Sequence, residues 1–523
     1  MSKDEELLFV RTTSGLVRVI SPYTVIFLAL APSLSAYFLA TSPQLIVSYP
    51  GVDLPLLFFL AGLILIIEGV GEFFLMVTMP RSGGDYVVLG RSLGPFFGVM
   101  EGWRATLQNP ISLGFGNYTA AYTIPGFISL LGVVMKDSGM VALGSSLSTN
   151  QMFIVGMAIL LAVIGALFDL LGPRIMSRWM SFWGIVTLIG LVLMWVLALQ
   201  NPAATLRDRW DAVWAPGAYD EVVTVAQANG WRPAVFSWDS MFKALFIPVS
   251  MLWPYNAIPV AGEVSEPKKS FLIGAVGSAA VMCVVTTLTA WSYIYSYGDF
   301  ASQYSYVILK GFGGQLTKSP RLSISYPTFA ALLAPQSPVL VGYLGGLVVW
   351  SNFGRMPSSF FWTTRNAFAM AMDRFAPEWF TRISRWHSPK YGVLFCFLLG
   401  CAAIVLCSYS PWLAVVSLLA IYFFIRFEWT LCEIVLPYLR RHIWERGLPL
   451  TIGALPVLTL VGIVNAILFG FFMLNAIVGA KIETIYAFLL TYGTAIVLFL
   501  IYAHWNTKKG LPIDKTFYEL PPE

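Results

Sequence analysis

Several ionisable residues lie inside long apolar segments, where a charge is expensive and is therefore a candidate for function. Glu68 and Glu72 are four residues apart, which places them on one face of a helix. Glu101 and Arg104 are three residues apart and can form an ion pair. Two kinds of chemistry fit these positions: a structural ion pair, or a proton relay with Glu68, Glu72 and Glu101 as the coupling candidates.

Two further positions extend this set. Arg426 and Glu433 are seven residues apart and also share a helix face, and Arg355 lies within another apolar segment. Structural pairing and a functional role both remain open for them.

Prolines interrupt two of the apolar segments, and a proline inside a membrane helix frees backbone groups that then need other partners. Segment 17–40 contains Pro32 among small residues, and segment 241–262 contains three prolines within twelve residues. The two interruptions lie five segments apart, which predicts an inverted repeat whose broken helices meet at a binding site. The residues that we expect to bind the solute are Ala31, Pro32, Ser33, Ser35, Ser250, Trp253 and Tyr255.

The elements that must position these residues are membrane helices. The chain has 523 residues, of which 57% are hydrophobic and only 11% charged, whereas a soluble domain has about 25% charged residues. Segments of about 20 apolar residues are long enough to cross a bilayer. Such segments are 17–40, 54–78, 95–133, 151–171, 177–200, 241–262, 271–297, 337–372, 391–408, 411–437, 451–475 and 482–504. The third and eighth are too long for one perpendicular crossing.

The predicted fold is therefore an all-α polytopic membrane protein with 12 transmembrane helices, arranged as a 5+5 inverted repeat plus two C-terminal helices. Residues 1–240 hold the N-terminal tail and the first repeat, 241–437 the second repeat, 438–505 the last two helices, and 506–523 a tail. Most of the 32 Lys and Arg residues fall on one side, which predicts cytoplasmic N- and C-termini in a cell membrane. The external segments 201–240 and 298–336 are long. They fit either interfacial loops, with Trp210 and Trp231 at the membrane surface, or a lid over an outer vestibule. The interfacial loops are favoured.

Other functional classes lack their signatures. The net charge of +5 is spread thinly, which gives no reason to expect nucleic acid as a partner. The five cysteines and three histidines do not form a metal or redox pattern, so no cofactor is predicted. No hydrolase, metalloprotease or P-loop motif is present, so the chain is not expected to be an enzyme. Nothing in the sequence predicts an oligomeric state.

Three motifs resemble those of the amino acid–polyamine–organocation (APC) superfamily. The first is MPRSGGDY at 79–86 followed by GVMEGW at 98–103, the second is GEVSEPK at 262–268, and the third is TRNAFAMAMDRFAP at 364–377. They occur in order and at suitable distances after the second, sixth and eighth predicted spans. The chain departs from the family pattern at Pro32 and Trp253, where the family prefers glycine.

The resemblance implies an amino acid permease-like secondary transporter that works by alternating access, with the solute between the first and sixth spans. A carrier of polyamines or other organic cations is the close alternative, and a transporter-like sensor or scaffold without flux is the alternative of another class. The resemblance also places Ser358 and Ser359 where hydroxyls of this fold can bind sodium. Coupling to either Na⁺ or H⁺ is expected. The partners are a small amino acid or amine and the lipid bilayer.

Overall fold

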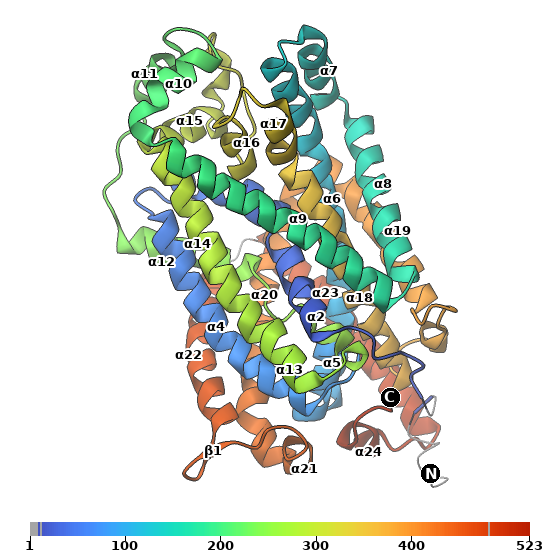
Figure 1. The fold of residues 1–523 in the computed structure, drawn as a ribbon. Coiled ribbons are helices and arrows are strands. Elements are labelled where there is room, and N and C mark those ends of the chain that lie inside the picture. The colour runs from blue at the N-terminus through green and yellow to red at the C-terminus, as the bar shows by residue number, and fades with distance from the viewer. Residues whose placement is uncertain (1–8, 11–12, 480–481, 523) are drawn as a thin grey trace.

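The structure is a computed structural model that describes residues 9–10, 13–479 and 482–522. Long helices form an elongated bundle, and both ends of the chain lie at the same end of it (Figure 1). We call this the terminal end, and the opposite end the cap end. The long helices are α4 Leu54–Thr78, α6 Pro95–Val134, α8 Gln151–Leu170, α9 Pro173–Gln200, α14 Ser278–Tyr297, α18 Leu347–Met372, α19 Lys390–Tyr409, α20 Pro411–Leu439, α22 Val457–Val478 and α23 Ile482–Lys508.

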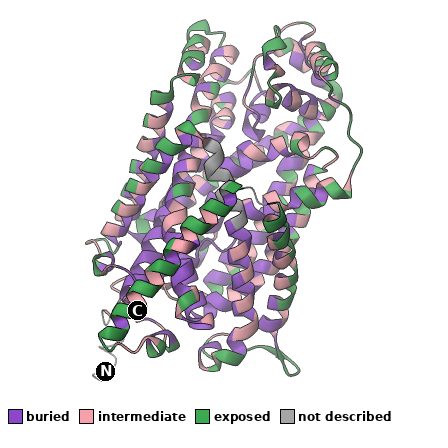
Figure 2. Ribbon diagram, turned by 180° about the vertical axis from the view of Figure 1, so that it is seen from behind, coloured by how far each residue is buried: buried purple, intermediate pink, exposed green. Residues whose placement is uncertain are grey.

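Eight helices within the described residues are long and apolar enough to cross a membrane. Buried residues fill the interior of the bundle, and exposed residues lie along the outer faces of its helices (Figure 2). On α9 these exposed residues include Ile185, Ile189 and Val192, so the outer face is apolar and suits lipid. These features agree with the predicted polytopic helical membrane protein. The count of twelve spans and the inverted repeat stay predictions.

The four predicted spans outside that group correspond to α6, α12 Trp238–Met251, α18 and α20. Three of them, α6, α18 and α20, carry buried charged residues. Helix α12 is too short to cross a membrane, because the chain unwinds after it. Helix α6 has 40 residues and is about 60 Å long at 1.5 Å per residue, so it extends beyond a bilayer core as its length predicted. The predicted eighth span is instead divided into α17 Pro338–Gly345 and α18.

Both predicted helix breaks are confirmed. Helix α2 Pro22–Ser33 begins at the capping residue Ser21 and ends directly after Pro32. The chain then continues through a π-helical turn, η1 Tyr37–Thr41, a 3₁₀ turn, η2 Ser42–Gln44, and α3 Leu45–Ser48. Helix α12 ends at Met251, residues 252–257 are not helical, and a 3₁₀ segment, η4 Ile258–Glu263, follows. A second π-helical segment, η5 Leu272–Gly277, joins α13 Pro267–Phe271 to α14.

The cap end is a folded layer of short helices and not the pair of interfacial loops favoured by the sequence. Its elements are α7 Ser138–Ser148, η3 Ala203–Thr205, α10 Leu206–Val213, α11 Ala218–Ala228, α15 Asp299–Leu309, η6 Phe312–Gln315 and α16 Tyr326–Ala331. The interfacial placement of Trp210 is wrong, because its ring is only 2% exposed and its Nε1 donates to Ser319 Oγ at 3.1 Å. Trp231 is buried as well. Both rings lie among other aromatic residues of the cap, which shield them from water.

Two carboxylates hold the cap together. Glu221 on α11 accepts hydrogen bonds from the backbone N–H groups of Thr317, Lys318 and Ser319. Burial raises the pKa of Glu221, but these hydrogen bonds outweigh burial and hold the pKa below its usual value. Asp211 on α10 has a lowered pKa for the related reason that backbone N–H groups, first that of Tyr219, donate to it.

Short elements close the terminal end. They are α5 Gly84–Leu93, η7 Glu378–Thr381, α21 Arg441–Trp444, α24 Ile513–Tyr518 and the antiparallel pair of β1 Thr451–Ile452 with β2 Leu455–Pro456, in which Thr451 lies opposite Pro456. A tight turn precedes the short helix α5: Gly83 and Gly84 have φ angles of +114° and +41°. A side chain at Gly83 would place its Cβ 2.3 Å from Ala369 Cβ, so this turn also needs glycine for packing.

Candidate functional site

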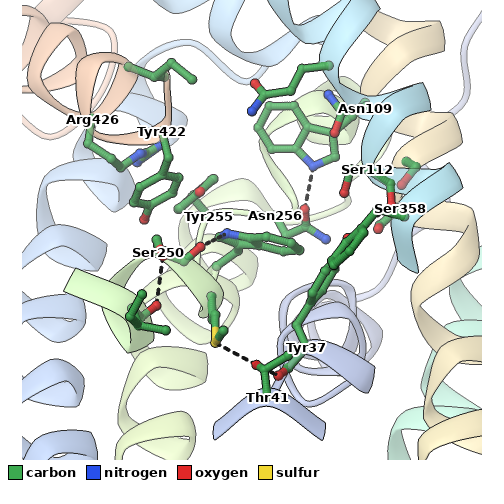
Figure 3. Close-up of a pocket in the computed structure, with 18 of the residues that line it drawn as sticks. Tyr37, Thr41, Asn109, Ser112, Ser250, Tyr255, Asn256, Ser358, Tyr422 and Arg426 are labelled. Carbon is green, nitrogen blue, oxygen red and sulfur yellow. Dashed lines mark hydrogen bonds between the residues drawn. The ribbon is translucent and has the colours of Figure 1, made fainter. Parts of the chain in front are cut away.

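A cavity of about 320 Å³ lies where the two broken helices meet (Figure 3). Its wall includes Tyr37 and Thr41 from η1, Asn109 and Ser112 from α6, and Trp253 and Asn256 from the unwound segment after α12. Helices α18 and α20 complete the wall. The cavity is therefore built by elements from both halves of the chain.

Hydrogen bonds between the two breaks hold this arrangement. The backbone N–H of Trp253 donates to Ser33 Oγ at 2.8 Å, and Asn256 Nδ2 donates to the carbonyl oxygen of Leu28 at 2.7 Å. Each bond satisfies a backbone group that the break leaves without a helical partner. The indole N–H of Trp362 on α18 donates to Asn256 Oδ1 and so ties a third element to the breaks.

Aromatic rings form much of the cavity wall. Tyr37 stacks on Phe115 with 5.3 Å between ring centroids and meets the edge of Trp253 at 6.0 Å. On the other side, Tyr255 packs against Trp362 at 6.1 Å and Tyr422 at 6.4 Å. Faces of aromatic rings attract cations as well as apolar groups, so this wall suits a solute that carries an ammonium group beside an apolar part.

The predicted solute-binding residues divide into two groups. Ser250, Trp253 and Tyr255 line the cavity. Ala31, Pro32, Ser33 and Ser35 are buried at the α2 break beside it, but they are not among the lining residues.

The hydroxyls of this second group are already used inside the protein. Ser33 accepts from Trp253, as described above, and Ser35 Oγ donates to the carbonyl oxygen of Pro32 at 2.6 Å. These serines therefore shape the break, and the cavity surface comes from residues on either side of it.

Ser358 and Ser359, the predicted sodium-binding pair, also line the cavity. Both are buried, at 4% and 3% exposure, on α18, which packs against α2. Thr363 Oγ1 donates to the carbonyl oxygen of Ser359 at 3.0 Å. The pair thus faces the region between α2 and α18, and sodium binding there stays a prediction.

Arg426 on α20 lines the cavity and is buried against two carboxylates of α4. Its guanidinium pairs with Glu68 at 2.9 Å and with Glu72. The same group lies over the ring of Tyr255, 3.6 Å from the centroid. Glu68 and Glu72 are therefore ion-paired beneath the cavity wall, which is the structural alternative that the sequence left open.

A second charged group lies further along the same wall. Arg104 pairs with Glu101 at 2.6 Å, as their spacing predicted, and also with Asp85 on α5 at 2.6 Å. Arg104 and Asp85 line the cavity, whereas Glu101 lies behind them. The spacing could not show the Asp85 contact, because that residue comes from another helix.

The other two charges that the sequence singled out, Glu433 and Arg355, have polar partners. Glu433 accepts a hydrogen bond from Asn465 Nδ2 at 2.9 Å, whereas Arg426 turns to Glu68 and Glu72. Arg355 donates to Asn352 Oδ1 at 2.9 Å, and its guanidinium lies 5.3 Å from the ring centroid of Tyr37.

Residues of the second and third sequence motifs join buried ion networks at the terminal end. Arg365 on α18 pairs with Asp169 at 2.8 Å and with Glu263 at 2.9 Å, and all three side chains are fully buried. Arg91 on α5 donates two hydrogen bonds to Asp373, at 2.5 and 3.1 Å. These contacts join elements that are far apart in the sequence and close the bundle below the cavity.

Several lining residues were not predicted. Tyr37, Asn109, Ser112, Asn256 and Trp362 all contribute to the wall. A signal was present for two of them, because Asn109 and Ser112 are polar residues within an apolar span and lie three apart on one helix face. The others needed the contacts between spans.

A family model described as "Amino acid permease" matches residues 20–502, which is almost the whole chain. No curated protein matches the chain.

Proposed function

The chain belongs to the amino acid permease family, and from that premise we propose that it is a secondary active transporter of amino acids that works by alternating access. Membership places it among multi-pass membrane proteins that transport amino acids or related substrates. The finer proposal is that the solute binds between the α2 and α12 breaks, with both chain termini in the cytoplasm.

The observation that carries this proposal is the cavity between the two broken helices. It is lined by Ser250, Trp253, Tyr255, Ser358 and Ser359, all of which the sequence had singled out. Its volume of about 320 Å³ suits a small solute. Charged groups at its wall offer partners for the carboxylate and the ammonium of an amino acid.

A carrier of polyamines or other organic cations is the second candidate. The aromatic wall favours it, since Tyr37, Trp253, Tyr255, Trp362 and Tyr422 present rings around one cavity. Asp85 adds a carboxylate to the same wall.

The experiment is uptake into proteoliposomes with a panel of labelled amino acids, polyamines and quaternary amines, each with and without sodium and pH gradients. Steady flux separates a carrier from a sensor or scaffold, and the sodium arm tests the Ser358–Ser359 prediction. If no member of the panel enters the vesicles, the proposed function is refuted.

A matched pair of variants tests the site. Trp253→Ala should raise the KM about tenfold, the factor that a loss of 1.4 kcal/mol of contact produces. Trp505→Ala removes the same side chain from the exposed surface of α23 and should leave KM unchanged. Equal KM values for the two variants would place the solute elsewhere.

A further inference from the structure

Six acidic side chains are buried together between α4, α5, α6 and α20. They are Glu68, Glu72, Asp85, Glu101, Glu428 and Glu433, none more than 6% exposed. Within the part of the chain that the structure describes, two guanidinium groups, Arg104 and Arg426, form ion pairs with members of this cluster. A buried carboxylate without a compensating positive charge is very costly, so the group neutralises instead. Part of this cluster must therefore carry protons.

The pair of Glu101 and Glu428 shows where one proton lies. Glu101 accepts from Arg104 Nε at 2.6 Å and from the hydroxyl of Tyr492 at 2.7 Å, so each of its two oxygens already accepts a hydrogen bond. The carboxyl of Glu428 neighbours that of Glu101. One oxygen of Glu428 is buried and has no donor among the described residues. Two buried carboxyls that neighbour each other share a proton, because they cannot both be ionised so close together.

Among the described residues, the surroundings of Glu428 supply no second cation. The groups that face the pair are Arg104 from α6, Asp85 from α5, the thiol of Cys432 on α20 itself and the hydroxyl of Tyr492 from α23. Arg104 is already shared by Glu101 and Asp85. The proton on Glu428 is therefore the means by which this group of three acids and one arginine avoids a large negative charge.

Arg104 connects the pair to the cavity. Its Nη1 donates to Gln108 at 2.5 Å and its Nη2 to Asp85 at 2.6 Å, and all three of these residues line the cavity. Loss of the proton from Glu428 would add a negative charge next to Glu101, draw Arg104 towards the pair and weaken its hold on Asp85. The charge at the cavity wall would then depend on whether Glu428 is protonated.

We propose that Glu428, paired with Glu101, is an exchangeable proton-binding site, and that Arg104 couples its occupancy to solute binding at the cavity wall. The inference rests on the proposed function, because coupling requires a transported solute. In this scheme H⁺ is the ion that drives transport of the solute. The proton leaves as H⁺ to water when the O–H bond of the Glu428 carboxyl breaks, and it returns by re-forming that bond; no other covalent bond of the protein changes.

The test compares Glu428→Gln with a matched control, Glu433→Gln, in proteoliposomes. Both substitutions remove a buried carboxyl from α20, but Glu433 bonds to Asn465, whereas Glu428 neighbours Glu101. Glu428→Gln should lose the part of uptake that depends on an imposed pH gradient and retain exchange of internal for external solute. Glu433→Gln should retain both. The inference is overturned if wild-type uptake does not depend on the pH gradient. It is also overturned if gradient-driven uptake persists in Glu428→Gln.

Infrared spectroscopy of the purified full-length protein tests the proton without transport. Glu428→Gln should remove a component of the protonated-carboxyl band that is present in the wild type and in Glu433→Gln. An unchanged band in Glu428→Gln refutes the proton site even if the variant does not transport. A wild type that moves no solute but shows this component refutes the proposed function and leaves the proton site standing.

Discussion

The ion network around Arg365 should be the main support of the terminal end. The Arg365 guanidinium donates to Glu263 at 2.9 and 3.2 Å and to Asp169 at 2.8 and 3.0 Å. Arg365→Ala would leave two fully buried carboxylates without their cation. Breaking one buried ion pair costs about 3–5 kcal/mol, and we expect at least the lower value here. For a chain of this size, 3 kcal/mol corresponds to a decrease in Tm of about 3 °C.

The assay is thermal unfolding of the detergent-purified protein, followed by the loss of the monodisperse peak in size-exclusion chromatography. Arg385→Ala is the control, because this exposed residue of the terminal end only stacks on Trp386. Its Tm should stay within about 1 °C of the wild type, as expected for a surface substitution. If the Tm of Arg365→Ala stays as close to the wild-type value as that of the control, this ion network does not stabilise the terminal end.

Three further outcomes follow from the described contacts. Gly83→Val should lower Tm, because a side chain there meets Ala369 at 2.3 Å and the backbone φ is +114°. Phe517→Ala should lower the free energy of unfolding by about 3–5 kcal/mol, because its ring is fully buried against Arg91. The same assay should show this loss as a lower Tm. For Glu221, the folded-state pKa is lowered, so its contribution is complete above the unfolded pKa of about 4.3 and is lost as pH falls through the folded value. The protection of the amides of 317–319, measured relative to the intrinsic exchange rate at each pH, should therefore fall in acid, and Glu221→Gln should remove that pH dependence of the protection.

The two helix breaks were predictable because their cause is local. Pro32 and the three prolines of segment 241–262 remove backbone hydrogen bonds whatever the rest of the chain does. The turn at Gly83 and Gly84 was predictable for the same reason, since a positive φ suits only glycine there. Features that depend on one residue and its backbone are available from sequence alone.

The partners of the buried charges were not predictable in this way. Glu101 and Arg104 pair within one helix, so their spacing sufficed, but Asp85, Trp429 and Tyr492 reach the same group from other helices. The cap helices were missed because their short amphipathic segments bury against each other, and that burial exists only after the bundle has formed. Residues 1–8 and 11–12 lie outside the described residues, so the predicted N-terminal tail is largely outside the structure.

Different interactions hold the elements on the two sides of the cavity, which bears on how alternating access would work. At the terminal end, Arg365 and Arg91 hold the elements through ion pairs. Separating such a pair into water costs little net free energy, because hydration of the charges replaces the lost attraction. Towards the cap, Tyr37 and Trp253 are held by ring packing and by hydrogen bonds to Ser112 and Ser33, and water does not replace lost apolar contact. Opening the terminal end should therefore respond to salt and to charge substitutions, whereas opening towards the cap should respond to the size of the ring at Trp253.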